Sequence, residues 1–468
     1  MEQSELYIVG GTVITGDGHT MLSNATVHVV NDKIVDIDAS GNRPPLVGND
    51  HAIRVINAER GFVIPGVVNA HAHGCTTGPV FSSAAAPLDR EHAWRNADRH
   101  LAAGVTTLIN VCGLGDQQDL TALDDHPMRI FISTTHFAEA FAAARIVDGA
   151  GLSGRHEALH AQEMLSGGQA VAIGEVGSGA TLGGGVSSYK YVPQAVREIF
   201  GQEIDAAQAG QLIDSLLGAR RELPERDEAF DGCLLKLGLI KENNSQDPKV
   251  AQLKEAIMRY AYEPVAHSLK TFEQAAALSA QTQYPAVFHT ALPSVATLLE
   301  IATKPLYRDA ILVAGHMNHT SIPLEDMLVY AAKLKDAGVV IDVSVLDSVS
   351  TRQLVTPKEI DALMASGLVD TLSTDYAAGH WDSMLEAIQR WWRKGIVPLP
   401  KGVEMATSRP AAIFKAAAER RGRLAPGYCA DIVITEEVNI GRVRTVIIDG
   451  RVVREFDAVV PRHMDCCS

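Results

Sequence analysis

Two histidines stand at the end of an apolar stretch. His71 and His73 follow the run Val63–Ala70 and come directly before Gly74. Successive residues of a β-strand point to opposite faces, so both imidazoles are expected on one side of a strand end. Two imidazoles placed in this way can bind one metal ion. The pair alone does not establish a metal site, because two histidines can fall two positions apart by chance in 468 residues.

Further potential metal ligands close later apolar segments. Glu175 lies in Ile173–Gly177, His289 and His316 end two subsequent segments, and Asp375 follows Ser373-Thr374. A single histidine at a strand end is more often an ordinary polar residue than a ligand. Four imidazoles and two carboxylates at matching positions together predict a metal site.

The elements that carry these residues alternate between two hydrophobic patterns. Eight segments are expected as strands: Val63–His71, Val105–Val111, Arg129–Thr135, Ala170–Val176, Ala286–Thr290, Ile311–His316, Val339–Val343 and Val369–Asp375. Most are separated by alanine-rich segments with helical periodicity, such as Arg90–Ala103, Pro323–Ala337 and Pro357–Ser366. This alternation predicts an α/β fold with a (β/α)8 TIM barrel, whose site lies at the carboxyl ends of the strands. The alternative, a doubly wound open sheet, lacks the Gly-rich first turn.

The two chain ends have a different, all-β pattern. Short strands are expected at residues 6–14, 25–30 and 33–38, with a turn at Asn31-Asp32. Near the other end, Asp449-Gly450 separates two β-branched runs, which is typical of a hairpin. We therefore expect one small β-sandwich built from residues 1–62 and 406–468, the latter including a tail, around a barrel over residues 63–405.

The connection between Val176 and Ala286 is far longer than a typical strand-to-helix connection. It contains amphipathic segments at Pro193–Leu217 and Pro248–Tyr262, and Val265–Ala280 is expected as the fourth barrel helix. The part of this connection before that helix is expected to be a helical insertion at about residues 185–263. Its role as a lid, as an oligomer contact or as a plain surface insertion is open.

Composition and charge restrict the classes of partner. The chain is 46% hydrophobic and 21% charged, with a formal net charge of −15. This charge argues against nucleic acid or an anionic membrane as a partner, and no apolar run is long enough to span a bilayer. Met1–Glu5 carries acids where a signal peptide carries basic residues, and the six cysteines form no CxxC pair. We expect a cytoplasmic protein that acts on a small molecule.

Two longer segments carry a resemblance to a known family. Residues 65–73, Pro-Gly-Val-Val-Asn-Ala-His-Ala-His, and residues 422–433, which end in Ala-Asp-Ile-Val, resemble the amidohydrolase superfamily. The resemblance covers nearly the whole chain and implies the barrel with a β-sandwich formed by both ends. Within the superfamily, the Gly-Glu-Val-Gly, Phe-His-Thr, Gly-His and Thr-Asp segments are most similar to enamidase-like cyclic amide hydrolases.

The resemblance also implies a set of ligands and cofactors. It implies two divalent metal ions, zinc first, with iron or manganese as alternatives, and a dimeric or tetrameric homo-oligomer. His71, His73 and Asp375 would hold the first ion, His289 and His316 the second, and Glu175 would bridge them. Many family members bridge with a carbamylated lysine, which Glu175 replaces here.

One departure from the family pattern opens a second possibility. Asn69 stands where binuclear members usually carry aspartate, and this resembles the mononuclear deaminase branch. Against that branch, Leu292 stands three residues after His289, where those deaminases keep an acidic proton shuttle. Glu175 favours two ions.

The expected chemistry is hydrolysis of a carbon–nitrogen bond of a cyclic amide or lactam. A metal-bound hydroxide would attack the carbonyl carbon, while Asp375 would accept a proton as base and return it to the leaving nitrogen as acid. A deaminase of a heterocyclic amidine is the alternative enzyme. A scaffold that has lost catalysis is the non-enzyme alternative, although it would not need six convergent ligands.

Some residues near the predicted site are weaker candidates for substrate contact. They are Cys75, His136, His319, His380 and Trp381. For Cys75, lining the pocket is favoured over a role as nucleophile. For His136 an ordinary loop histidine is favoured, and for His319 a place behind the ligands or in solvent. Gly183–Gly185 lacks the lysine and Ser/Thr of a phosphate-binding loop.

Overall fold

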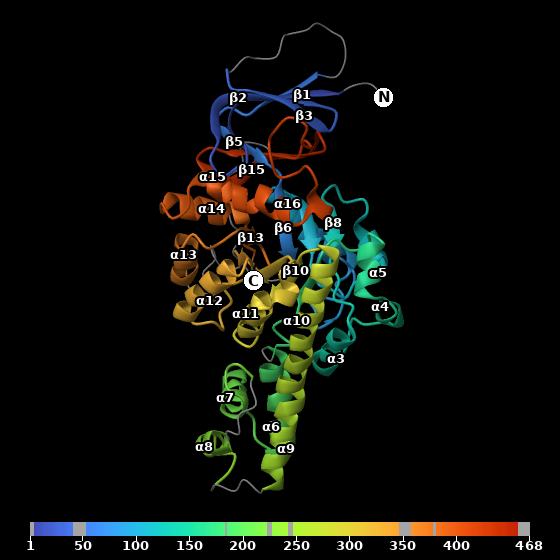
Figure 1. The fold of residues 1–468 in the computed structure, drawn as a ribbon, viewed down its shortest axis with the longest axis vertical. Helices are drawn as coiled ribbons and strands as arrows, with labels where there is room; N and C mark the ends of the chain where they lie inside the picture. Colours follow the sequence, from blue (N-terminus) through green and yellow to red (C-terminus); the bar gives the residue numbers. More distant parts are fainter. Residues whose placement is uncertain are drawn as a thin grey trace.

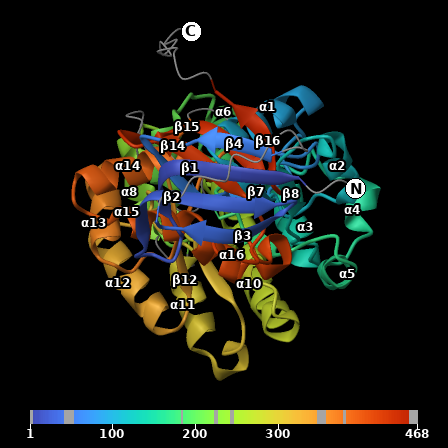
Figure 2. The same ribbon diagram turned by 90° about the horizontal axis from the view of Figure 1, so that it is seen from above.

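The computed structural model describes residues 4–40, 53–182, 185–221, 227–241, 247–345, 357–377 and 381–456. A sheet made by both chain ends lies at one end of an α/β body, and a group of helices projects from the opposite end (Figure 1). Figure 2 shows strands β1, β2 and β3 lying across the body, with α12 and α13 on one side and α4 and α5 on the other.

Among the described residues, the chain-end sheet has eight strands. Its order is β16-β15-β14-β5-β1-β2-β3, and β4 pairs with β1. The strands are β1 (Glu5–Ile14), β2 (Met21–Val30), β3 (Lys33–Asp38), β4 (Ile53–Asn57), β5 (Gly61–Pro65), β14 (Ile432–Glu436), β15 (Asn439–Ile448) and β16 (Arg451–Glu455). Apolar side chains from both ends share one buried cluster that includes Ile8, Val27, Ile434 and Ile447. Burial of these side chains stabilises the pairing of segments far apart in sequence.

Both predicted hairpin turns are confirmed. Val30 pairs with Lys33 across Asn31-Asp32, and Ile448 pairs with Arg451 across Asp449-Gly450. The two turns meet, because a Cβ atom at Gly450 would lie 1.8 Å from the carbonyl oxygen of Asn31. Only glycine allows this close approach, and its φ of +74° also favours glycine.

Over the part of the chain that the structure describes, the body contains eight strands in two parallel sheets. One sheet has the order β6-β7-β8 and the other β13-β12-β11-β10-β9. The strands are β6 (Val67–Ala72), β7 (Val105–Asn110), β8 (Arg129–Ile132), β9 (Ile173–Val176), β10 (Ala286–His289), β11 (Leu312–Gly315), β12 (Val340–Ser344) and β13 (Thr371–Ser373). Their near-continuous burial is typical of parallel strands covered on both faces. The predicted α/β class is confirmed.

Backbone hydrogen bonds join the two parallel sheets at both edges. The Thr134 N–H donates to Ala172 O at 2.9 Å, which links the end of β8 to the start of β9. The Asp375 N–H donates to His71 O at 2.9 Å, and the His73 N–H donates to Tyr376 O at the same distance. The second pair links the loops that follow β6 and β13.

Helices separate the strands and cover them. Those of the body are α1 (Arg90–Ala102), α2 (Gln117–Leu120), η1 (Thr121–Leu123), α3 (Ala138–Val147), α4 (Gly154–Glu157), α5 (Ala161–Ser166), α10 (Glu263–Thr282), α11 (Val295–Thr303), η4 (Pro305–Tyr307), α12 (Leu324–Asp336), α13 (Pro357–Ala365), α14 (Met384–Arg393), α15 (Leu399–Ala406), α16 (Ser408–Ile413) and α17 (Lys415–Ala418). Leu101, Phe272 and Leu334 lie with strand residues such as Phe288 in the largest buried cluster.

The segment after β9 forms the projecting helices of Figure 1. They are η2 (Ser187–Tyr191), α6 (Val192–Phe200), α7 (Ala206–Leu217), α8 (Asp227–Lys236), α9 (Pro248–Ile257) and η3 (Met258–Tyr262). They have a buried cluster of their own, with Ile213, Phe230 and Leu253 at its centre. Because this segment follows β9, it leaves the sheet at the strand end that carries Glu175.

The strand expected over Val63–His71 is two strands. β5 pairs with β14 in the chain-end sheet, whereas β6 begins the parallel set. Pro65 has no N–H to continue a ladder. A Cβ atom at Gly66 would lie 2.2 Å from Thr106 Oγ1, so the chain bends where only glycine fits.

Four cysteines, Cys75, Cys112, Cys233 and Cys429, are free thiols, and Cys466 and Cys467 lie outside the described residues. Within the described ranges, no helix combines the length and apolar character needed to cross a bilayer.

Candidate metal centre

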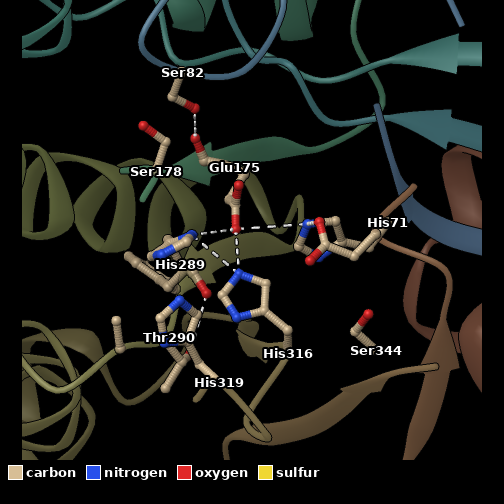
Figure 3. A network of polar contacts seen from close by, with 12 residues as sticks. His71, Ser82, Glu175, Ser178, His289, Thr290, His316, His319 and Ser344 are labelled. Carbon is tan, nitrogen blue, oxygen red and sulfur yellow. Dashed lines mark hydrogen bonds and ion pairs between the residues drawn. The ribbon is translucent and has the colours of Figure 1, made fainter. Parts of the chain in front are cut away.

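Six predicted side chains meet at the carboxyl ends of the parallel strands. Figure 3 shows four of them, His71, Glu175, His289 and His316. His71 belongs to β6 and His73 follows it, Glu175 belongs to β9, and His289 is the last residue of β10. His316 follows β11 directly, and Asp375 follows β13 after one residue. Each strand supplies its ligand at its end, and the strand order brings these ends together.

Glu175 lies at the centre of the group. Its Oε1 atom is 2.7 Å from His316 Nε2, 3.0 Å from His289 Nδ1 and 3.5 Å from His71 Nε2. Its Oε2 atom is 3.6 Å from His73 Nε2. The side chain is 2% exposed. One buried carboxylate therefore faces all four imidazoles.

Asp375 faces the first two histidines. Its Oδ1 atom is 3.2 Å from His73 Nε2 and 3.4 Å from His71 Nε2. Its side chain is 23% exposed, against 2% for Glu175. Asp375 is therefore the carboxylate of the pair that solvent or a small molecule can reach.

Burial and neighbouring charges oppose each other at the acidic groups. Burial has the largest effect on Glu175, but His289 and His71 outweigh it and hold the pKa of this carboxyl well below its usual value. At Asp375 burial is again outweighed, by the hydrogen bond with His73 and by nearby imidazoles, and the pKa falls to about 2. Both carboxylates are ionised at neutral pH, as ligands of a cation must be.

The same two effects, burial and neighbouring charge, shift the pKa values of the histidines in opposite directions. Burial lowers the pKa of His71 to about 4, so its imidazole is neutral. At His316 the effect of burial is outweighed by the hydrogen bond and charge of Glu175, which raise the pKa to about 9. A histidine binds a metal ion in its neutral form, so metal binding at His316 would release a proton.

The donor set fits divalent metal ions. Ligand atoms of His71, His73 and Asp375 lie within 4.8 Å of one another, and so do those of His71, Glu175 and His316. Both nitrogens of His71, His289 Nε2 and His316 Nδ1 are buried without a hydrogen-bond partner. His316 Nε2 and His289 Nδ1 lie 3.0 Å apart, which brings two ring nitrogens to one point. Imidazole and carboxylate are the ligands that zinc and similar ions take.

Backbone geometry at the site is specialised. His316 and Asp375 have φ angles of 36° and 51°, which non-glycine residues rarely adopt. A Cβ atom at Gly315 would lie 3.0 Å from His71 Cε1 and 3.1 Å from the carbonyl oxygen of Phe288. The His71 ring therefore packs against a position that only glycine leaves free. Strain held by surrounding structure is typical of functional sites.

Comparison with known proteins agrees with this geometry. A model of the amidohydrolase family matches residues 294–453, which include His316 and Asp375. This stretch, about a third of the chain, is therefore similar to that family.

Solved structures with the same fold cover nearly the whole chain. Beta-aspartyl dipeptidase from the thermophilic, keratin-degrading Fervidobacterium islandicum AW-1 is 15% identical, with 97% of each chain covered and a TM-score of 0.55. A D-aminoacylase whose binuclear metal centre has been studied is 13% identical, with 98% of each chain covered and a TM-score of 0.52. At these identities the likeness concerns the fold.

One curated protein shares a shorter stretch. An adenine deaminase of Oleidesulfovibrio alaskensis is 35% identical over 80 residues, which are 17% of this chain. The match spans 13% of the deaminase's own length.

Asn69, the departure from the family pattern, lies beneath the site. Its Nδ2 atom donates to Thr374 Oγ1 at 2.8 Å, and its Oδ1 atom accepts from the backbone N–H of His71 and of Thr374, both at 3.3 Å. It therefore ties β6 to the segment before Asp375. His100 continues the network, with Nε2 3.1 Å from Thr374 Oγ1.

Two weaker candidates, Cys75 and Trp381, lie beside His100. The Cys75 Sγ atom is 3.9 Å from His100 Nδ1, and burial raises the pKa of this thiol far above its usual value. The Trp381 ring lies 4.8 Å from that of His100 and 5.0 Å from that of Tyr376. A buried neutral thiol is a poor nucleophile. Their predicted contact with substrate stays a prediction.

His319 lies nearer to the centre. Its ring centroid is 5.2 Å from that of His289 and 5.5 Å from that of His316. The Ser321 N–H donates to its Nδ1 atom at 3.2 Å. Since Nδ1 accepts, the proton of the neutral ring is on Nε2. Burial lowers the pKa of His319 well below its usual value, so the ring is neutral.

His136 is separate from the six residues. It is buried, its Nδ1 atom is 2.9 Å from Thr134 Oγ1, and its ring packs on Phe141 at 5.7 Å. Burial lowers its pKa to about 3. His380 lies outside the described residues.

Sequence reasoning missed several neighbours of the site. Cys112 Sγ is 3.6 Å from His73 Nδ1, and the Phe81 ring lies 4.9 Å from the His73 ring. Asn96 donates to Gly74 O and to Ala377 O, both at 2.9 Å. No local motif marks these residues, because each contacts the site through a loop or helix from elsewhere in the chain.

Proposed function

We propose that this chain opens a cyclic amide or lactam by hydrolysis of its carbon–nitrogen bond. The observation that carries the proposal is the convergence of four imidazoles on the ionised Glu175, with the ionised Asp375 facing two of them. The substrate is a small molecule, since Asp375 is the reachable carboxylate of an otherwise buried centre.

We infer that the eight parallel strands close into a (β/α)8 barrel. The hydrogen bonds between β8 and β9, and between the loops after β6 and β13, support closure. The buried cluster shared by both chain ends supports a small β-sandwich. The domain limits of 1–62, 63–405 and 406–468, and the insertion at 185–263 as lid or oligomer contact, belong to the same proposal.

Two divalent ions, zinc first, would be held by the six residues. His71, His73 and Asp375 would hold one, His289 and His316 the other, and Glu175 would lie between them. When bound, the ions supply Lewis-acid activation of the attacking water and of the amide carbonyl.

Asp375 would move the proton. Its pKa of about 2 keeps it ionised at neutral pH, so it can accept a proton from the attacking water. It then gives this proton to the leaving nitrogen as the carbon–nitrogen bond breaks. In a cyclic amide the new carboxylate and the new amine stay in one molecule.

His319 would bind the substrate oxygen. Its Nδ1 atom is occupied as an acceptor, so Nε2–H is the donor that the ring offers. A neutral donor placed beside His289 and His316 would stabilise the negative charge that develops on the carbonyl oxygen.

A deaminase of a heterocyclic amidine is the second candidate. Asn69 in place of aspartate and the partial match to an adenine deaminase favour it. Water activated at the same centre would then attack a ring carbon. Ammonia would leave, and the ring would stay closed.

Product analysis separates the two. The zinc-loaded chain is incubated with lactams, cyclic imides and adenine, and the products are followed by mass spectrometry and an ammonia assay. We expect a gain of one water without ammonia, lost in Asp375→Asn and kept in the control Glu300→Gln, an exposed residue of α11. Ammonia release from adenine with all cyclic amides untouched would contradict the proposal and favour the deaminase.

A further inference from the structure

Phe81 combines an exposed aromatic ring with a strained backbone. Its φ angle is 57°, in the left-handed region that bulky side chains rarely adopt. The residue is 36% exposed, whereas large apolar side chains are usually buried. A residue kept in such a conformation by its surroundings is typical of a ligand-binding position.

Contacts on both sides of Phe81 hold it over the metal centre. Val80 and Ala85 bond to each other through their backbones at 3.0 and 2.8 Å, which closes a tight turn around Phe81. The Ser82 hydroxyl donates to the backbone carbonyl of Glu175. The turn is therefore tied directly to the residue at the middle of the site.

The ring itself packs on His73. The two ring centroids are 4.9 Å apart and the planes are inclined by 58°. His73 is buried at 1% exposure, whereas Phe81 is partly exposed. The exposed part of Phe81 is therefore apolar surface directly beside the buried ligands. Such a surface attracts a planar apolar group through offset or edge-on contact.

We propose that Phe81 determines specificity by selecting substrates with a planar apolar group, such as a phenyl ring, next to the amide that is cleaved. The inference deepens the proposed function and rests on its metal centre. A substrate with a small aliphatic group at this place would leave the ring exposed to water and would bind more weakly.

Hydroxamates test this without any turnover, because they bind metal ions and carry a chosen substituent. Dissociation constants of benzohydroxamate and acetohydroxamate are measured by calorimetry on the zinc-loaded chain and on Phe81→Ala and Phe81→Gly. We expect the native chain to bind the phenyl compound about tenfold more tightly. Both variants should lose this preference. If the two smaller side chains cause loss of zinc, the two dissociation constants are compared in Phe81→Leu instead, which keeps apolar volume but has no planar ring.

Stability gives an independent readout. Glycine adopts positive φ without strain, so Phe81→Gly should melt at a higher temperature than Phe81→Ala while binding both hydroxamates equally. An equal preference in native and variant chains, or no preference in the native chain, would overturn the inference. The native chain could open no cyclic amide while its phenyl preference is still lost in both Phe81 variants. That result would contradict the proposed function alone.

Discussion

At the scale of single residues, the site depends on a glycine as much as on its ligands. The His71 ring packs against Gly315, where a Cβ atom would meet both this ring and the backbone of Phe288. Backbone cannot move easily, so His71 must shift if a side chain is added. Ligand sets lose affinity when one member moves by a fraction of an ångström.

Gly315→Ala should therefore weaken zinc binding by tenfold or more and reduce activity in parallel. Zinc affinity is measured by competition with a chelator. Gly210→Ala is the matched control, because a Cβ atom at Gly210 meets nothing within 4 Å. Unchanged zinc affinity in Gly315→Ala would show that His71 is not a ligand.

The six residues that meet could be predicted from the sequence, because each lies at the end of an apolar strand. The carboxyl ends of neighbouring parallel strands lie together, which brings the six side chains to one place. Phe81, Asn96 and His100 could not be predicted as neighbours of the site. Phe81 approaches through a tight turn, and the other two reach the loops after β6 and β13 from α1. These contacts depend on how loops and helices are placed in the fold, and neither the hydrophobic periodicity nor the spacing of residues in the sequence predicts that placement.

At the scale of elements, a polar network joins the loops on one side of the site. Asp119 in α2 accepts from His156 of α4 at 3.0 Å and pairs with Arg155 of the same helix. Its backbone carbonyl accepts from the Thr77 N–H in the loop after β6 at 3.1 Å. The loops after three neighbouring strands are therefore held by one residue, which joins two of them through its buried carboxylate and the third through its backbone carbonyl.

This network predicts a dependence of stability on pH. Burial would raise the pKa of Asp119, but His156, the Asp116 backbone and Arg155 outweigh it and lower the pKa. A carboxyl with a lowered folded pKa stabilises fully above its unfolded pKa of about 3.9, and the contribution is lost as the pH falls through the folded value.

Asp119→Asn should then be less stable than the native chain by about 2 kcal/mol at pH 7. The difference should shrink as the pH falls from 5 to 3, as measured by urea denaturation at each pH. A difference that is constant or grows in acid would mean that the charge of Asp119 is not what holds the loops.

At the scale of the whole molecule, ion pairs fasten the chain-end sheet to the body. Arg129 of β8 pairs with the buried Asp431 and, at 2.8 Å, with Asp449. Arg421 contacts the same two carboxylates at 2.9 and 2.8 Å. The hairpins and the sharing of one sheet by both chain ends were predictable. The two ion pairs of Arg129 were not, because they join residues some 300 positions apart.

Arg129→Met should lower stability by about 3 kcal/mol, because Asp431 would keep a buried charge with one partner fewer. Thermal melting of the zinc-loaded chain measures the loss. Arg95→Met, which removes an exposed pair within α1, is the control and should change stability by less than about 1 kcal/mol. Equal melting temperatures for the two variants would contradict the fastening role.

Metal content tests the central claim most directly. Elemental analysis is made on the native chain and on Glu175→Gln after reconstitution with zinc and removal of free ions. We expect about two ions per native chain and fewer in the variant, because Glu175 faces all four imidazoles. One ion in both chains would contradict the bridged centre and move the assignment to the deaminase. No ion in either would contradict the metal site itself.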